Sequence, residues 1–448
     1  MSSQSSFSHQ APSIRRVAAA WWPLAVSWLL MAAETPILAA VVARLANPDI
    51  HLAAYGSVTF PLIGILQAPI LTLLSLSTAM SKDMDSFLKG RKLMLILGGG
   101  LTLLYVLITF TPAYYFIVEN LIGAPAEIVE PARLGMFVGV PWIFAVAYRR
   151  FHQGVMIRLD HSRTVTIGTM FRFLADAVVI GLALWIGTIP GTVFATIMMV
   201  CGVVTEAVYV GIRVRPVLKY ELKQIPSLQD KILLRDMVAF FIPLGMTPLL
   251  NQLIRPIGSA ALSRMPDPLL TLAIWPVIAG YSFLIVTPGA AYNEVVIALL
   301  DRPGARRSLQ YFLFILMGVQ FLLMAILSLT PLSYYLFWKV SGLPADLAHL
   351  ASRAFVLLIP GSLISPLNSW FGGVILHSRR SRVITEGMII YLLVYILGLW
   401  VGGSLLEVSG IYIVVSASML ASLSQTGWLA FRSKPSIQAL KEDPLPVT

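Results

Sequence analysis

The sequence predicts an all-α polytopic membrane protein with about 12 transmembrane helices in two parallel six-helix bundles. The first observation is composition, because 57% of the 448 residues are hydrophobic and only 12% are charged, whereas about a quarter of a soluble domain is charged. The second is spacing, since the apolar residues form about a dozen stretches of roughly 20 to 30 residues, each long enough to cross a bilayer. The third is an internal repeat. Together they exclude a soluble globular protein.

Six spans are expected in each half of the chain. The expected spans are 17–45, 52–80, 91–118, 131–156, 164–188, 190–212, 235–263, 268–300, 308–338, 346–376, 383–404 and 408–431. Proline and glycine recur inside the spans and at their ends, with 28 Pro and 32 Gly in the chain. In a membrane this pattern is typical of bent or broken helices that pack on one another.

The basic residues predict the orientation of the chain. They gather in the segments that connect the spans on one side, which are 15–16, 82–92, 149–163, 213–235, 302–307, 379–382 and 432–441. The positive-inside rule then places both termini in the cytoplasm. The net charge of +11 is explained by this topology and by contact with anionic lipid headgroups, so no nucleic-acid partner is expected.

The two halves of the chain repeat one another. When the sequence is aligned with itself, Pro23-Leu24-Ala25 matches Pro243-Leu244-Gly245, Gly154-Val155 matches Gly373-Val374, and Arg163 matches Arg382. Because each half has an even number of helices, the halves should have the same orientation and be related by a pseudo-twofold axis along the membrane normal. The expected domains are a cytoplasmic tail (1–16), an N-lobe (17–212), a cytoplasmic linker (213–234), a C-lobe (235–431) and a second cytoplasmic tail (432–448).

Three charged residues of the first half fall at membrane depth, where each charge needs a partner or water. Glu34 lies beside Pro36, whose ring removes a backbone hydrogen bond and favours a hinge. Arg172 and Asp176 are four residues apart, on one helix face, and can pair. The repeat places Ile254, Tyr391 and Tyr395 at the matching positions. We expect Glu34, Asp176 and Arg172 to form an ion-coupling site, with a static network that fixes helix packing as the alternative.

The second half has a deep cation in Arg255, which precedes a second expected hinge, Pro256. Asn251 and Gln252 lie on the same helix, and Glu294 lies on the next. A guanidinium that faces a cleft would bind a carboxylate or phosphate with two parallel hydrogen bonds. We expect these four polar side chains to bind substrate, with an Arg255–Glu294 salt bridge as the alternative.

Arg149 and Arg150 are further candidates for substrate binding, because a pair of cations near the end of a span can concentrate anions in an inner vestibule. The alternative is an ordinary positive-inside anchor. Glu206, near the end of the sixth span, is expected to pair with arginines of the linker.

The six-plus-six pattern with a proline in the first helix of each half resembles the multidrug and toxic compound extrusion (MATE) transporters of the multidrug/oligosaccharidyl-lipid/polysaccharide (MOP) flippase superfamily. The run Gln252 to Ile257 and the segment from Pro141 to Asp176 also resemble the progressive ankylosis family of anion exporters. The MATE resemblance implies a cation-coupling site of carboxylates on helices 1 and 5 of the first lobe, which matches Glu34 and Asp176. Arg172 departs from that pattern.

The sequence has no phosphate-cradling glycine loop and no paired-histidine metal motif, so neither enzyme activity nor a metal or cofactor is expected. Without a nucleotide-binding domain, a transporter must use an ion gradient or a separate partner. We therefore expect a monomeric secondary active transporter in the cell membrane, of the bacterial inner-membrane type, whose partners are the lipid bilayer and a small-molecule substrate. It would export a small or amphipathic solute, including an organic or phosphate-containing anion, coupled to H⁺ or Na⁺. The alternatives are a flippase for a lipid-linked precursor, a cationic multidrug antiporter and a membrane-embedded lipid-modifying enzyme.

Overall fold

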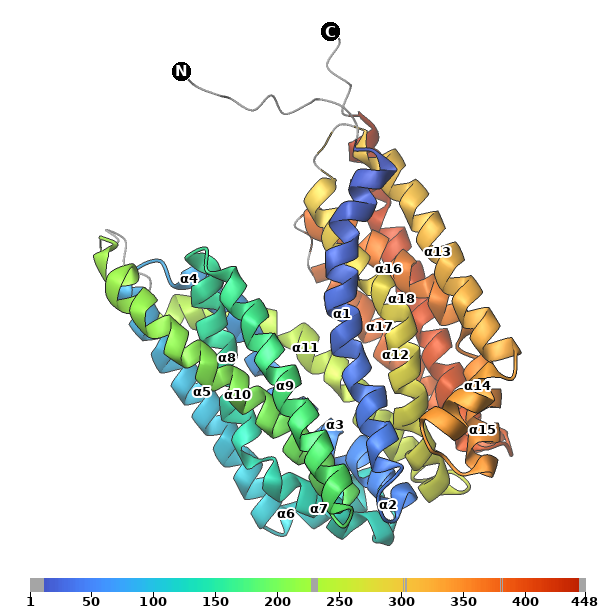
Figure 1. Cartoon of the computed structure of the whole chain (residues 1–448). Coiled ribbons are helices and arrows are strands. Elements are labelled where there is room, and N and C mark those ends of the chain that lie inside the picture. Colours follow the sequence, from blue (N-terminus) through green and yellow to red (C-terminus); the bar gives the residue numbers. More distant parts are fainter. Residues whose placement is uncertain are drawn as a thin grey trace. The chain divides into compact units, whose positions relative to one another are not determined.

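The computed structural model describes residues 12–226, 233–300, 302, 304–378, 380 and 382–442. The expected cytoplasmic tails 1–16 and 432–448 and the linker 213–234 therefore lie partly outside the described residues. Every regular element over the described residues is a helix and none is a strand, which confirms the all-α prediction (Figure 1).

The helices of the first half alternate long spans with short connecting turns. They are α1 Ile14–Val42, α2 Pro48–Ala53, η1 Ala54–Thr59, α3 Phe60–Gln67, η2 Pro69–Thr72, α4 Leu73–Met80, α5 Met84–Phe110, α6 Ala113–Tyr115, η3 Phe116–Ile122, α7 Ala126–Val138, α8 Val140–Arg158, α9 Ser162–Ile186, α10 Gly191–Tyr220 and η4 Leu222–Gln224. Local sequence sets these ends. At the start of α5, for example, the Asp83 carboxylate accepts a hydrogen bond from the Ser86 backbone N–H at 2.9 Å and caps the helix.

The helices of the second half follow the same order. They are α11 Leu234–Leu262, α12 Pro268–Leu299, α13 Ala305–Leu329, α14 Leu332–Tyr335, η5 Leu336–Val340, α15 Ala345–Val356, α16 Ile359–His377, α17 Arg382–Leu405 and α18 Gly410–Glu442. The alignment that pairs Pro23 with Pro243 also pairs the first residue of α1 with that of α11. The alignment that pairs Gly154 with Gly373 does the same for α8 and α16, and for α10 and α18. The helices thus reproduce the repeat that the sequence predicts.

Nine helices over the described residues are long and apolar enough to cross a membrane, and two bent helix pairs raise the number to as many as eleven. The bent pairs are α7 with α8, at 44°, and α15 with α16, at 48°. Helix α11, which covers the expected seventh span, is not among the eleven. A proline follows each bend within the first turn of the next helix, Pro141 in α8 and Pro360 in α16.

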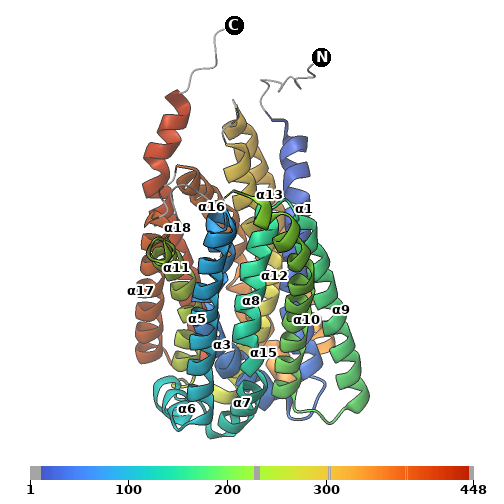
Figure 2. The ribbon, with the colours of Figure 1, turned by 90° about the vertical axis from the view of Figure 1, so that its left-hand side faces the viewer.

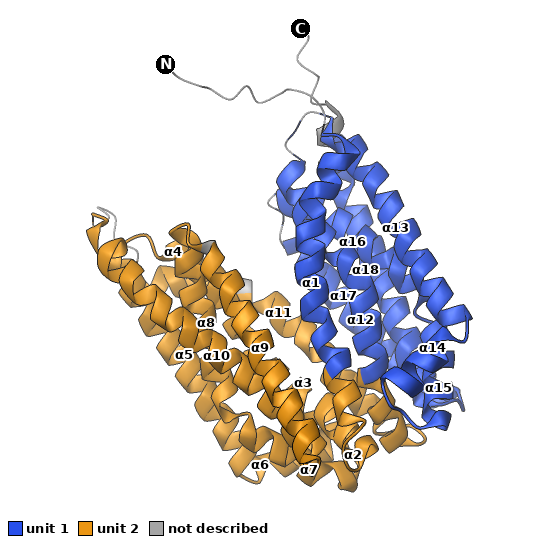
Figure 3. Ribbon diagram, viewed as in Figure 1, with its two compact units in different colours: residues 1–37, 277–448 blue, residues 38–276 orange. Residues whose placement is uncertain are grey.

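The chain forms two compact units, which exchange their first helices (Figure 3). Unit 1 comprises Met1–Ile37 and Val277–Thr448, and unit 2 comprises Leu38–Pro276. These boundaries differ from the expected lobes 17–212 and 235–431, because most of α1 packs with the helices of the second half and α11 packs with those of the first. Val17 of α1, for instance, belongs to the same apolar core as Tyr292 of α12.

Within unit 2, α8 packs against both α5 and α10, and α10 packs against α9 (Figure 2). Small residues allow this approach. A Cβ atom on Gly98 of α5 would lie 2.8 Å from the Cβ of Ala147 in α8, and one on Gly154 of α8 would overlap the Ser77 hydroxyl of α4. Gly98, Gly99 and Gly100 are consecutive in α5, but a Cβ atom on Gly99 or Gly100 would meet no atom within 4 Å. Of these three glycines, only Gly98 therefore serves helix packing. Helix α8 is thereby held at the centre of unit 2.

Candidate functional site

A charge cluster lies inside unit 2, where α8, α9 and α10 meet. Its members are Arg149, Arg150 and Gln153 of α8, Thr169, Arg172 and Asp176 of α9, and Glu206 of α10. Arg172 and Asp176 lie near the middle of the candidate span Arg163–Ile186, and Glu206 near the middle of Gly191–Gln224. The cluster therefore stands at the depth where an uncompensated charge is costly.

Glu206 is the hub of the charge cluster and is only 1% exposed. Its carboxylate forms a salt bridge with Arg149 and accepts hydrogen bonds from the Gln153 amide at 2.7 Å and the Thr169 hydroxyl at 3.4 Å. The expectation that Glu206 pairs with arginines of the linker is therefore wrong. The expectation placed Glu206 too close to the helix end, whereas its position in the middle of α10 directs it to α8 and α9.

Arg172 and Asp176 form the second ion pair of the cluster. The Arg172 Nε atom lies 3.9 Å from the Asp176 carboxylate, as their spacing of four residues predicts. Asp176 is 3% exposed. A Cβ atom on Gly202 of α10 would overlap its carboxylate, so the absence of a side chain at Gly202 makes room for the acid.

Arg150 is the cation of the cluster without a carboxylate partner. It lies close enough to Arg149, Glu206 and Arg172 for electrostatic interaction with each of them. Over the described residues of unit 2 it forms no ion pair, and its buried Nε atom has no hydrogen-bond partner. A buried donor of this kind costs free energy unless a ligand or water satisfies it.

Arg255 is a further cation of unit 2 and lies on α11, outside the charge cluster. Its guanidinium lies over the ring of Phe60 at 4.9 Å from the ring centroid, and Phe60 packs on Tyr55 at 5.8 Å between centroids. Gln252, one turn earlier, packs its amide against Gly64 of α3. Within the described part of unit 2, Arg255 also forms no ion pair with a carboxylate. Aromatic faces stabilise a cation without neutralising it.

Together, the charge cluster and Arg255 contain four guanidinium groups and two carboxylates, a surplus of two positive charges. Charges held out of water are stable only when they are paired or bind an ion. A planar guanidinium suits a carboxylate or phosphate, which it binds through two N–H groups. The interior of unit 2 is therefore chemically suited to an anion.

The remaining predicted residues lie elsewhere. Glu34 is half-buried on α1 in unit 1, and Glu294 is exposed on α12, where it accepts a hydrogen bond from Trp28 at 3.3 Å. Asn251 is exposed on α11. The expected pairs of Glu34 with Asp176 and of Arg255 with Glu294 are each divided between the two units, so they stay predictions.

The two expected hinges differ in their relation to the units. Pro36 is buried against Gly280 of α12, and the chain passes from unit 1 to unit 2 directly after it, between Ile37 and Leu38. Pro256 lies inside unit 2. The second passage between the units follows Pro276 of α12, so a proline precedes both passages.

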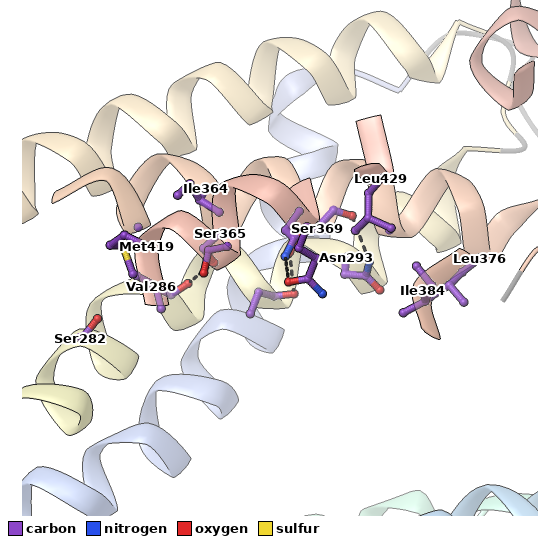
Figure 4. Close-up of a pocket in the computed structure, with 16 residues that line it drawn as sticks. Ser282, Val286, Asn293, Ile364, Ser365, Ser369, Leu376, Ile384, Met419 and Leu429 are labelled. Atoms are coloured by element: carbon purple, nitrogen blue, oxygen red, sulfur yellow. Dashed lines mark hydrogen bonds between the residues drawn. The ribbon is translucent and has the colours of Figure 1, made fainter. Parts of the chain in front are cut away.

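Unit 1 carries a neutral counterpart of the charge cluster. The alignment of Gly154 with Gly373 also matches Arg149 to Asn368, Arg150 to Ser369, Gln153 to Gly372 and Glu206 to Gln425. The Asn368 amide donates to the Gln425 amide oxygen at 3.4 Å, where unit 2 has its salt bridge. A cavity of about 440 Å³ opens beside these residues (Figure 4).

Sequence reasoning missed Gln153, Asn368 and Gln425 as site residues. The available signal was the repeat itself, because the alignment that pairs Gly154 with Gly373 also pairs each charged residue of the cluster with a neutral one.

Over the part of the chain that the structure describes, no group of three or more His, Cys, Asp or Glu residues could hold a metal ion.

Comparison with solved structures finds MATE transporters and a lipid flippase. An inward-facing conformation of a multidrug resistance MATE family transporter of the MOP superfamily matches with a TM-score of 0.73 and 16% identity, over 94% of this chain and 99% of that one. The eukaryotic MATE transporter AtDTX14 matches with a TM-score of 0.67 and 14% identity, over 96% and 99%. The lipid II flippase MurJ, in an inward closed conformation, matches with a TM-score of 0.60 and 14% identity, over 92% and 89%.

No family model matches the sequence, and no curated protein matches it. The structural matches extend over nearly the whole length of each chain, which bears out the resemblance drawn from the repeat and the proline-bearing first helices. The chain therefore has the fold that MATE family transporters share with the MurJ flippase.

Proposed function

We propose that this protein is a secondary active transporter that exports a small or amphipathic organic anion by alternating access. The observation that carries the proposal is the surplus of guanidinium groups inside unit 2, where Arg150 and Arg255 form no ion pair among the described residues of the unit. A carboxylate on the solute would neutralise one of these two charges, and a phosphate dianion would offset both. The fold, which is that of known transporters and a flippase, supports transport.

The driving force in this proposal is a proton or sodium gradient, and the coupling groups are Glu34 and Asp176. Both carboxylates lie on helices that are long and apolar enough to cross a membrane. The Arg172 Nε atom lies 3.9 Å from the Asp176 carboxylate. A neighbouring guanidinium favours the ionised form of an acid. Release of the Asp176–Arg172 pair would therefore accompany ion binding during the transport cycle, and Pro36 would serve as the hinge of α1.

The test is transport in proteoliposomes with two probes of opposite charge. We expect an imposed pH or sodium gradient to drive the flux of p-aminohippurate, an aromatic carboxylate, and to leave the flux of the cation ethidium at the level of empty liposomes. Glu34→Gln and Asp176→Asn should each uncouple p-aminohippurate flux from the gradient. Asp85→Asn, which changes a half-exposed carboxylate paired with Lys89, is the matched control and should transport normally.

Three results would contradict the proposal. Driven ethidium flux without p-aminohippurate flux would indicate a cationic multidrug antiporter instead. Flux that persists unchanged in both Glu34→Gln and Asp176→Asn would remove these carboxylates from the coupling mechanism. Absence of flux for both probes under every gradient would argue against an organic anion exporter.

A further inference from the structure

The cavity of unit 1 lies among α12, α16, α17 and α18 and is lined by polar but uncharged side chains (Figure 4). Its polar lining residues are Ser282 and Asn293 of α12, Ser365, Asn368 and Ser369 of α16, and Ser422 and Gln425 of α18. None of the 16 lining residues carries a charge or a group that titrates. Its volume of about 440 Å³ falls within the range of about 300–1,000 Å³ that is usual for small-molecule sites.

The cavity exists because of how the two repeats differ. In unit 2 the corresponding positions of α8 hold two long arginines and a glutamine, and Arg149 and Gln153 reach Glu206 of α10. In unit 1 they hold Asn368, Ser369 and Gly372, which are much shorter. One glycine contact is common to both repeats, since a Cβ atom on Gly373 would meet Val296 of α12, and one on Gly154 would meet Ser77 of α4, at the matching position.

Several polar groups around the cavity have unused hydrogen-bonding capacity. The Oδ1 atom of Asn368 is buried and has no hydrogen-bond partner among the described residues. Among the described residues, the Gln425 amide group donates only to the Met388 sulfur, at 3.9 Å, and a thioether sulfur is a weak acceptor. The hydroxyl of Ser365 donates to the Val286 carbonyl at 2.9 Å, and over the part of the chain that the structure describes no donor uses the lone pairs of its oxygen.

We propose that this cavity is a binding site for an uncharged solute that both donates and accepts hydrogen bonds, of the class of polyols and glycosides. Amide and hydroxyl groups supply donors and acceptors for the ligand hydroxyls. Val286, Ile364, Met419 and Leu429 provide an apolar wall for a sugar face or an aglycone.

A charged ligand does not fit this site. An ion that enters the cavity would lose hydration without meeting an opposite charge, which is unfavourable by several kcal/mol. The nearest acid in sequence, Glu294, is exposed and hydrogen-bonded to Trp28 of α1, and it does not line the cavity. Binding at the cavity should therefore not depend on pH.

The test measures equilibrium binding to the full chain in nanodiscs with two probes that share one aromatic group. We expect p-nitrophenyl glucoside, which is neutral, to bind saturably. Asn368→Leu and Gln425→Leu should each weaken its binding at least about tenfold, because each removes a hydrogen bond and leaves the ligand hydroxyl unpaired. Asn120→Leu, at an exposed amide of unit 2, is the matched control and should bind the glucoside as the wild type does.

Any binding of p-nitrophenyl phosphate, which is a dianion, should be unaffected by Asn368→Leu and Gln425→Leu. If these variants unfold, Ser422→Phe provides a second test, since it fills the cavity without removing an amide and should also abolish glucoside binding. Absence of saturable glucoside binding to the wild type would overturn the proposal. Equal affinity in all the cavity variants, or equal loss for the glucoside and the phosphate, would do so as well.

Discussion

Replacement of the Arg149–Glu206 salt bridge by the neutral pair of the other repeat should reveal how strongly the two charges depend on each other. Glu206→Gln removes the carboxylate that neutralises Arg149, whose side chain is only 9% exposed. An uncompensated buried charge costs about 3–5 kcal/mol. Arg149→Asn should cost a similar amount, because the Gln153 and Thr169 hydrogen bonds leave the negative charge of Glu206 in place.

The double variant Arg149→Asn/Glu206→Gln recreates the Asn368–Gln425 pair of unit 1, which forms a hydrogen bond at 3.4 Å. No buried charge is then left unpaired, and the remaining losses are a hydrogen bond, of about 1 kcal/mol, and some packing around the shorter Asn. The double variant should therefore be no less stable than either single variant. Because each single variant costs about 3–5 kcal/mol, the coupling energy should be at least about 3 kcal/mol, the upper end of the usual range for contacting residues.

The assay is the free energy of unfolding, from titration of detergent-solubilised protein with SDS and followed by tryptophan fluorescence. Arg149→Asn combined with Glu221→Gln is the control, because Glu221 is exposed and pairs with His161. These two changes should be additive within about 0.5 kcal/mol. A coupling energy of the Arg149–Glu206 pair that is equally small would refute the view that the two charges stabilise unit 2 as a pair.

Two further predictions concern packing and titration. Gly154→Ala should lower the free energy of unfolding by about 1–3 kcal/mol, because its methyl group would overlap Ser77. Gly99→Ala should raise it by about 0.5–1 kcal/mol, because its methyl group would meet no atom within 4 Å. Equal effects of the two changes in the same SDS titration would show that helix α8 does not need Gly154. Tyr115 lies on α6, beyond the end of the span Met84–Phe110, and its hydrogen bond to Glu130 at 2.6 Å raises its pKa. This bond therefore stabilises the fold below the ordinary tyrosine pKa of about 10, and its contribution is lost as the pH rises through the higher value. The difference between the ultraviolet titrations of wild type and Tyr115→Phe should show a phenol that titrates late, and Glu130→Gln should return it towards the ordinary pKa.

The helices and their duplication could be predicted from the sequence because both depend on local features. Apolar stretches of membrane length and matched prolines and glycines recur in each half, and the structure reproduces both. The exchange of first helices between the compact units could not be predicted. It depends on which apolar face of α1 packs against α12. The sequence does not distinguish between apolar faces of similar composition, so it does not predict this choice.

The site was only partly predictable. Charged residues at membrane depth can be recognised in the sequence, because a charge within an apolar span is rare. Arg172 and Asp176 also pair as their spacing predicts. The partner of Glu206 depends on the rotation of α10 against α8, which helix spacing does not define. The neutral cavity was missed for another reason, since Asn368 and Gln425 are ordinary helix residues until they are set beside the arginine and glutamate of the other repeat.

The proposed function depends most on the binding of an anion by the surplus guanidinium groups of unit 2. Its most direct test is the binding isotherm of p-aminohippurate to the full chain in nanodiscs. We predict that Arg150→Gln and Arg255→Gln each weaken binding at least about tenfold, the effect of one lost charge-assisted hydrogen bond. Arg133→Gln should have no effect, because Arg133 also lies over aromatic rings but already donates to the Thr109 carbonyl. Unchanged affinity in both Arg150→Gln and Arg255→Gln would contradict the proposed function.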